Sequence, residues 1–196
     1  MKSSVVRLIF LVLLVGAILS FHPQVQPLIH ELIWPHQDQQ LEMVTAPKGV
    51  SYLVKVEDLI FELTNKERQA KGLAPLARDE ELRQVARAYS NDMLVRGFFD
   101  HTTPDGLSID ERLENQYRHR VAVMGENIWS GSGYDPGQTV QLAKEIVADW
   151  MNSPEHRENL LSPDFTHLGV GVSARRSAIR ATQEFVGRSK LWPWSG

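Results

Sequence analysis

The chain has 196 residues, of which 42% are hydrophobic and 23% are charged, and its formal net charge is −3 at pH 7. These values are typical of a globular protein and give no electrostatic basis for binding nucleic acid. The sequence contains no cysteine, which excludes disulfide bonds, thiolate metal sites and a cysteine nucleophile. A folded domain must therefore be stabilised by its core alone, which is feasible for roughly 140 residues.

The N-terminal segment has the pattern of an export signal. Lys2 and Arg7 precede an unbroken apolar run, and the apolar stretch at residues 5–21 has about 17 residues, close to the minimum for spanning a bilayer. Residues 15–17 offer a poor cleavage site, and the run continues past them. This favours an uncleaved membrane anchor over a cleaved signal peptide at residues 1–21. The flanking positive charges predict a single-pass cell-membrane protein with its domain outside the cytoplasm. Secretion is the alternative.

Residues 22–50 differ in composition from the segments on either side. They include four prolines and several glutamines, a composition typical of a linker between a membrane and a domain. Periodic apolar residues begin near Ser51. We therefore assign residues 51–187 to one folded domain and residues 188–196 to a C-terminal tail.

Two helices are predicted at the start of the domain. Apolar residues at helical spacing indicate a first helix that ends near Ala70, and Gly72 follows it. Asp79 is a suitable N-cap for a second helix, which ends at Gly97. The apolar face of the second helix consists of Leu82, Val85, Ala86, Tyr89 and Met93.

Shorter elements follow. A capping-box pattern that begins at Ser108 predicts a short helix over Ile109 to Gln116. The remaining segments, in chain order, are a strand at 121–129, a helix at 139–151, a new helical turn at Pro154, and strands at 167–173 and 179–186 joined by a hairpin at 175–177. Because helices and strands do not alternate regularly, we predict an α+β domain with an antiparallel sheet.

Common catalytic and cofactor motifs, such as H-E-x-x-H, the phosphate loop and G-x-S-x-G, do not occur in the sequence. The notable polar residues are His101 in GFFDHTTPDG and Glu126 in GENIW. His101 follows two phenylalanines, so its imidazole should be partly buried and should need a partner such as the Glu126 carboxylate. Such a pair could bind a metal, act as a base with its orienting partner, or only fix the surrounding loops.

Four motifs occur in an order that resembles the CAP superfamily of cysteine-rich secretory proteins, antigen 5 and plant pathogenesis-related proteins. They are HTTPDG (101–106), GENIW (125–129), WMNSPEHRENLLSPDF (150–165) and HLGVGV (167–172). Their spacing is similar to that of the bacterial, cysteine-free branch, and the resemblance covers residues 52–187. It implies a three-layer α-β-α sandwich with a central antiparallel sheet.

The resemblance also implies a cleft with two histidines and two acidic residues, which in some family members binds a divalent metal. His101 matches the first histidine of that set, and Glu126 matches one acid. Where better-known relatives have the other two residues, this sequence has Ser153 and Asp164. Two matching ligands are too few for a firm site, so zinc or magnesium should bind weakly unless Asp164 or His156 contributes.

We therefore predict a ligand-binding cleft at the cell envelope formed by His101, Glu126, His156 and Asp164. The resemblance implies lipids, peptides or cell-wall components as ligands. The alternative is an extracytoplasmic hydrolase or peptidase, metal-assisted or not, in which His101 and Glu126 are catalytic. Against this alternative, the sequence shows no nucleophile with a positioned base. In a third interpretation the domain is a spacer. The sequence makes no prediction of oligomeric state.

Overall fold

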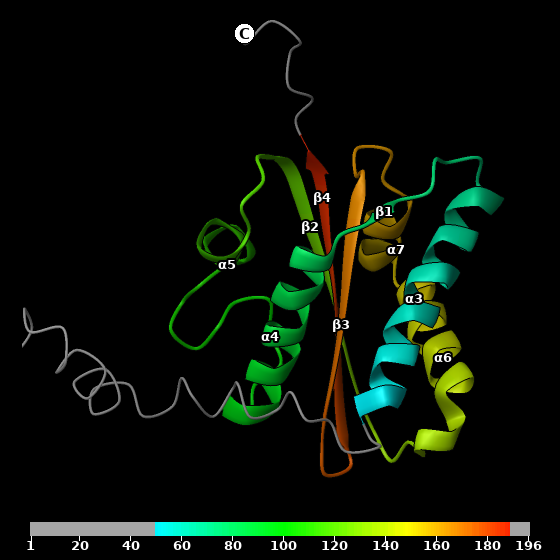
Figure 1. The fold of residues 1–196 in the computed structure, drawn as a ribbon, viewed down its shortest axis with the longest axis vertical. Coiled ribbons are helices and arrows are strands. Elements are labelled where there is room, and N and C mark those ends of the chain that lie inside the picture. The colour runs from blue at the N-terminus through cyan, green and yellow to red at the C-terminus, as the bar shows by residue number, and fades with distance from the viewer. Residues whose placement is uncertain (1–49, 189–196) are drawn as a thin grey trace, which may run out of the picture. The chain divides into compact units, whose positions relative to one another are not determined.

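The computed structural model describes residues 50–188 (Figure 1). Its elements in chain order are α3 (Val50–Ala70), β1 (Ala77–Arg78), α4 (Glu80–Arg96), α5 (Ile109–Gln116), β2 (Val121–Ser132), the 3-10 turn η3 (Pro136–Gln138), α6 (Thr139–Asn152), α7 (Pro154–Leu161), β3 (His167–Arg175) and β4 (Ala178–Arg188). The predicted membrane anchor at residues 5–21 lies outside the described residues, as do nearly all of the predicted linker and tail. None of the helices described is both long enough and apolar enough to cross a membrane.

The strands form one four-stranded sheet in the order β1-β3-β4-β2. The pairs β3–β4 and β4–β2 are antiparallel, as predicted. The short strand β1 was not predicted, and it pairs parallel to β3, so the sheet is mixed rather than wholly antiparallel. Ala77 N donates to Thr166 O and Asp79 N donates to Leu168 O, at 2.9 and 3.1 Å. A two-residue strand is too short to show alternation in a sequence.

Helices lie on both faces of this sheet (Figure 1). Side chains alternate along β4, as they must in a strand. Gln183 donates to Thr64 of α3 on one face, while Thr182 shares a hydrogen bond with Ser90 of α4 on the other. Helices α3, α6 and α7 cover the first face, and α4 and α5 lie on the second. The mixed α and β class predicted from the sequence is therefore confirmed.

Most of the hydrophobic core lies between the sheet and α3, α6 and α7. Trp150 and Phe185 are at most 1% exposed, and burying a large apolar side chain contributes roughly 2–3 kcal/mol. On the other face a smaller cluster joins α4 and α5 to the sheet. It consists of Leu82, Val85, Leu113, Tyr117 and Val186. The second face is thus less apolar, and it is the face that carries the buried charged groups of the candidate site.

Helix α4 packs directly on β3 because two glycines remove the side chains that would separate them. A Cβ at Gly169 would lie 2.3 Å from the Leu82 carbonyl carbon, and one at Gly171 would lie 2.1 Å from Arg87 N. The helix ends at Gly97, whose φ of 72° is the left-handed conformation that glycine adopts readily. The chain then leaves the helix as the loop that carries His101.

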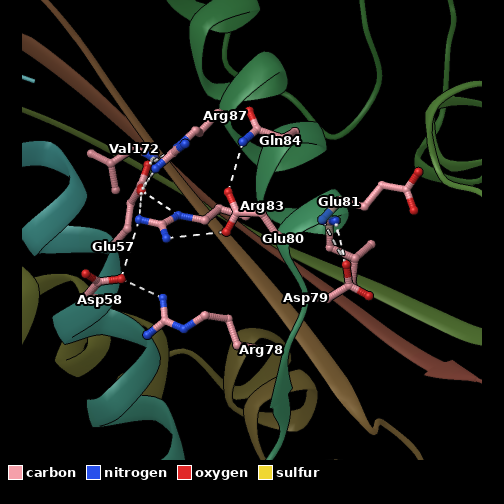
Figure 2. Close-up of polar contacts among 11 residues, drawn as sticks. Glu57, Asp58, Arg78, Asp79, Glu80, Glu81, Arg83, Gln84, Arg87 and Val172 are labelled. Atoms are coloured by element: carbon pink, nitrogen blue, oxygen red, sulfur yellow. Dashed lines mark hydrogen bonds and ion pairs between the residues drawn. The ribbon is translucent and has the colours of Figure 1, made fainter. Parts of the chain in front are cut away.

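A buried ion cluster covers the outer edge of β3, which β1 pairs with only at its start. Figure 2 shows Glu57 of α3 between Arg83 and Arg87 of α4. The Glu57 carboxylate accepts from both guanidinium groups, at 2.6 and 2.5 Å, and from Val172 N at 3.0 Å. Because Glu57 is only 1% exposed, the two cations compensate a carboxylate that would be costly to bury alone. The cluster joins α3 to α4 around the edge of the sheet.

The other edge of the sheet is β2, and side chains of α6 and α7 bind two of its carbonyl groups. Asn159 Nδ2 donates to Glu126 O at 3.0 Å, and Trp150 Nε1 donates to Ile128 O at 3.1 Å. These contacts fix the segment of β2 that presents the Glu126 side chain to the opposite face.

The helix boundaries predicted from local signals agree with the structure within a residue or two. Asp79 accepts from the N–H groups of Glu81 and Leu82, and the capping box of Ser108 is formed. Strand β2 continues to Ser132, beyond the predicted end at Trp129, because its glycine and serine residues still pair with β4.

Candidate functional site

His101 lies in the loop that follows α4, and several contacts fix the backbone around it. Tyr89 OH donates to Asp100 O at 2.5 Å, and Arg112 donates to His101 O at 2.9 Å. The ring of Phe98 packs edge-on against that of Tyr89. The loop is therefore attached to both α4 and α5, and the position of the imidazole is set by the fold.

The His101 imidazole is paired with Glu126 of β2. His101 Nδ1 and Glu126 Oε1 are 2.8 Å apart, and the two side chains are 54% and 3% exposed. An ionised carboxylate only accepts hydrogen bonds, so Nδ1 carries the proton, and Nε2 makes no hydrogen bond within residues 50–188. The hydrogen bond to Glu126 raises the pKa of His101, although partial burial opposes this shift.

Arg112 of α5 holds the second oxygen of Glu126. Its guanidinium pairs with Glu126 Oε2 and stacks 3.5 Å above the centre of the Tyr89 ring. The Arg112 side chain is 4% exposed, so this contact lies almost entirely out of water. The Glu126 carboxylate is thus held between a buried cation and the histidine, and it cannot turn away from His101 without losing Arg112.

A second acid, Glu184, lies beside this pair. Glu126 and Glu184 are directly paired on β2 and β4, and Arg112 approaches Glu184 Oε1 to 3.7 Å. Glu184 is fully buried, and neither carboxyl oxygen accepts a hydrogen bond within the described residues. Burial raises the pKa of Glu184 well above its ordinary value, and the charge of Glu126 adds to the effect. We take Glu184 to be protonated, with its hydroxyl available to the Glu126 carboxylate.

His156 of α7 is the other histidine near this group. Asn127 donates to His156 O at 3.1 Å, and Asn159 donates to Asn127 Oδ1 at 2.9 Å, which fastens α7 to β2. Burial lowers the pKa of His156, and the positive charge of His101 lowers it further. The contacts through Asn127 and Asn159 hold α7 beside the strand that carries Glu126.

Asp164 lies apart from these residues. It is exposed in the loop between α7 and β3, and it makes no hydrogen bond to His101, Glu126 or His156. With Arg157 and Glu158 it lines a separate surface hollow of about 430 Å³. Ser153 lies at the junction of α6 and α7. The structure therefore brings the side chains of His101 and Glu126 into direct contact and attaches the His156 backbone to the neighbouring Asn127, whereas Asp164 lies on another surface.

The donor set does not fit a divalent metal. Within residues 50–188 no group of three or more histidine, aspartate or glutamate side chains is arranged to hold one. Both oxygens of Glu126 are already engaged, by His101 and by Arg112. Among the predicted site residues, His101 and His156 add ring nitrogens, whereas zinc sites in proteins have three or four protein ligands. The arrangement that the structure shows directly is a histidine oriented by a carboxylate.

Arg112 and Glu184 were not identified from the sequence. Each is a charged residue at a position that faces the interior, on α5 and on β4. The alternation along β4 contained a signal, because Glu184 shares a face with the buried residues Thr182 and Val186. Nothing in the sequence indicated that Arg112 would meet both glutamates.

Comparisons with known proteins agree with this structure. The model of the cysteine-rich secretory protein family, CAP, matches residues 61–185. The chain is 41% identical to the Bacillus subtilis protein YkwD over 145 residues, which cover 74% of this chain and 51% of YkwD. It is 36% identical over 132 residues to the Bacillus subtilis membrane protein YlbC, covering 67% of this chain and 34% of YlbC.

A solved structure is also similar. An extracellular protein of Bacillus anthracis that contains an SCP domain matches with a TM-score of 0.57 and 32% identity, over 68% of this chain and 41% of that one. The chain thus spans about half, or less, of the length of these three relatives. The family match includes His101, Arg112, Glu126 and Glu184. The chain therefore belongs to the cysteine-rich secretory protein (CAP) family and is similar to cysteine-free bacterial members that contain an SCP domain.

Proposed function

We propose that this chain is a membrane-tethered CAP domain that binds a ligand outside the cytoplasm, in a cleft at His101, Glu126 and His156. The observation that carries the proposal is the orientation of His101. Its Nδ1 is held by a buried carboxylate, while the ring remains half exposed. The exposed part of this oriented ring can therefore contact a ligand.

His101 can recognise two kinds of group through its free Nε2. When the ring is neutral, Nε2 accepts a hydrogen bond from a hydroxyl or an amide. When the ring is protonated, Nε2 donates to a carboxylate or a phosphate, and the raised pKa extends this state toward neutral pH. Lipids, peptides and cell-wall components all carry such groups. Ligands with an anionic group fit best, because the protonated ring adds charge attraction to the hydrogen bond.

The proposed location rests on the sequence and on the relatives. The apolar stretch at residues 5–21 would anchor the chain in the membrane, with the domain in its three-layer α-β-α arrangement outside the cytoplasm. The similarity to a membrane protein of Bacillus subtilis and to an extracellular protein of Bacillus anthracis supports this location. Secretion after cleavage is the alternative outcome, and the mass of the mature N-terminus distinguishes the two.

Binding assays with one variant and a matched control test the proposed cleft. The full chain, held in detergent micelles, is mixed separately with purified peptidoglycan, a soluble short-chain anionic phospholipid and a peptide library, and the bound probe is measured. We expect the His101→Ala variant to lose binding to the probe that the wild type retains. His119→Ala, which removes a surface histidine beside Glu81, should bind as the wild type does. Equal binding by His101→Ala and the wild type would contradict the proposal.

Hydrolysis is the second candidate function, and the same dyad favours it. A histidine with Nδ1 bound to a carboxylate and Nε2 free has the arrangement of a general base that could activate water. Turnover of a peptide or cell-wall substrate would have to disappear in both His101→Ala and Glu126→Gln. If the wild type binds the substrate but does not hydrolyse it, only the binding function is supported.

A further inference from the structure

Three arginines at the end of the β3–β4 hairpin have no acidic partner. Arg175, Arg176 and Arg180 make no ion pair with any carboxylate of residues 50–188, whereas Arg87, Arg112 and others in the same range do. Arg175 donates weakly to Leu94 O, and Arg180 donates to Ile179 O. Their charges are therefore left uncompensated at one end of the domain.

The turn itself favours a different residue at its tip. Arg176 has a φ of 58° and is the one residue other than glycine with a positive φ among those described. Glycine or asparagine adopts this conformation at less cost, so hairpin turns usually carry them there. An arginine in this position is consistent with a use for its guanidinium, since strain of this kind tends to occur at functional positions.

Two exposed apolar residues belong to the segment that these arginines contact: Val95 follows Leu94, whose carbonyl accepts from Arg175, and the ring of Phe99 lies near Arg180. Val95, in the last turn of α4, is 56% exposed, and Phe99 is 47% exposed. The Arg180 guanidinium lies 5.5 Å from the centre of the Phe99 ring. We call this group the hairpin patch: Arg175, Arg176, Arg180, Val95 and Phe99. Two exposed carboxylates lie near this patch: Asp100 directly follows Phe99, and Asp135 lies in the loop after β2, where its side chain accepts from Gly137 N.

The chain enters the domain at the same end as the hairpin patch. Helix α3 runs opposite to β3, since Glu57 contacts Val172 whereas Thr64 contacts Gln183, the residue paired with Val170. The first residue of α3 therefore lies toward the hairpin, as Figure 1 also shows. Any anchor in residues 1–49 must connect to the domain from this end.

We infer that the hairpin patch is a docking surface for an anionic phospholipid bilayer, the one in which the chain is tethered. The inference rests on the membrane tether in the proposed function. Guanidinium groups form paired hydrogen bonds with phosphate oxygens, and exposed valine and phenylalanine side chains suit the boundary between headgroups and acyl chains. Such a contact would orient the domain and hold the His101 cleft at a fixed height above the membrane.

The contact is weak by itself and needs the tether. Each basic residue near an anionic surface strengthens binding roughly five-fold, so Arg175 and Arg176 together contribute about 25-fold. A domain without the tether would bind the membrane poorly, because a gain in affinity of about 25-fold is small. A tethered domain has a high effective concentration at the membrane, so the same contact becomes populated.

The absence of native cysteine makes a single-label experiment direct. The full chain carries Ser177→Cys, labelled with a fluorophore, in vesicles of phosphatidylcholine alone or with phosphatidylglycerol, both containing lipid-borne quencher. The comparison label is at Lys71→Cys, an exposed residue at the opposite end of α3. We expect quenching at position 177 in anionic vesicles but not at position 71, and Arg175→Gln with Arg176→Gln should weaken the contact about 25-fold.

Each other outcome overturns a defined step. Failure of the chain to float with either vesicle would overturn the tether, and with it the inference. Flotation without quenching at position 177, or quenching that is equal in both lipids, would overturn the inference alone. Soluble polyphosphate that abolishes the quenching at position 177 at a lower phosphate concentration than the anionic vesicles need to produce it would assign the patch to a polymer. That result would also overturn the inference.

Discussion

Glu126 and Glu184 lie side by side on β2 and β4, and the single guanidinium of Arg112 lies against both. Two buried carboxylates beside one buried cation favour a state in which one of them keeps its proton. Burial and the charge of Glu126 raise the pKa of Glu184, and neither of its carboxyl oxygens has a hydrogen-bond partner within residues 50–188. Glu126 remains available as the anionic partner of His101.

Glu184→Gln should flatten the dependence of stability on pH. Burial raises the pKa of Glu184 above the ordinary 4.5. Its contribution to folding is complete below the unfolded pKa and is lost as the pH rises through the folded pKa. The wild type should therefore lose stability above about pH 4.5, by up to roughly 1.4 kcal/mol per pH unit, and the glutamine variant should not. Thermal melting between about pH 4 and pH 8 measures the difference.

Glu114→Gln is the matched control for this experiment, because Glu114 is exposed on α5. It removes an acid of the same kind and should melt with the pH profile of the wild type. If the difference in Tm between Glu184→Gln and the wild type stays constant across this pH range, Glu184 is ionised in the folded protein. The assignment of a protonated Glu184 beside an ionised Glu126 would then be wrong.

Arg112→Ala should destabilise the domain strongly, because it leaves Glu126 buried without its cation. Removing one partner of a buried ion pair costs about 3–5 kcal/mol in the free energy of unfolding. Arg112→Lys keeps the charge but loses the planar stack on Tyr89, so it should fall between the alanine variant and the wild type. Urea unfolding gives all three values.

Arg118→Ala serves as the comparison, since Arg118 is 91% exposed in its surface pair with Glu81. Its effect should stay below about 1 kcal/mol. A loss for Arg112→Ala no larger than that would show that Arg112 does not compensate the buried acids.

The two histidines should titrate in opposite directions from the ordinary pKa of 6.5. The hydrogen bond to Glu126 raises the pKa of His101, whereas burial and the charge of His101 lower that of His156. Glu126→Gln should therefore lower the pKa of His101. His101→Ala should raise the pKa of His156 part of the way, because its burial remains. NMR titration of the imidazole resonances reads each value, and an unchanged His156 in His101→Ala would place the two rings too far apart to interact.

The sequence predicted those parts of the fold that depend on local signals. Asp79, Gly97 and the capping box at Ser108 act within one helical turn, so the ends of α4 and α5 followed from neighbouring residues. The strand β1 did not follow, since its pairing with β3 depends on residues about ninety positions away. Local patterns do not carry that information.

The candidate site divides in the same way. His101 and Glu126 were identified because of their residue types and their motifs, and the structure brings their side chains together. Arg112 and Glu184 were not predicted as site residues, because their role depends on three-dimensional contacts among α5, β2 and β4. Asp164 was proposed from its position in a motif, yet its loop holds it on another surface.

The side chains that cover β2 limit how a peptide could bind beside His101. An extended peptide commonly binds a sheet by adding a strand to a free edge, through hydrogen bonds from its own backbone. Beside His101, the carbonyl groups of Glu126 and Ile128 are already taken by Asn159 and Trp150. A peptide at this site would therefore be selected by its side chains or its charged terminus. Its backbone could not pair with these two carbonyl groups as an added strand would.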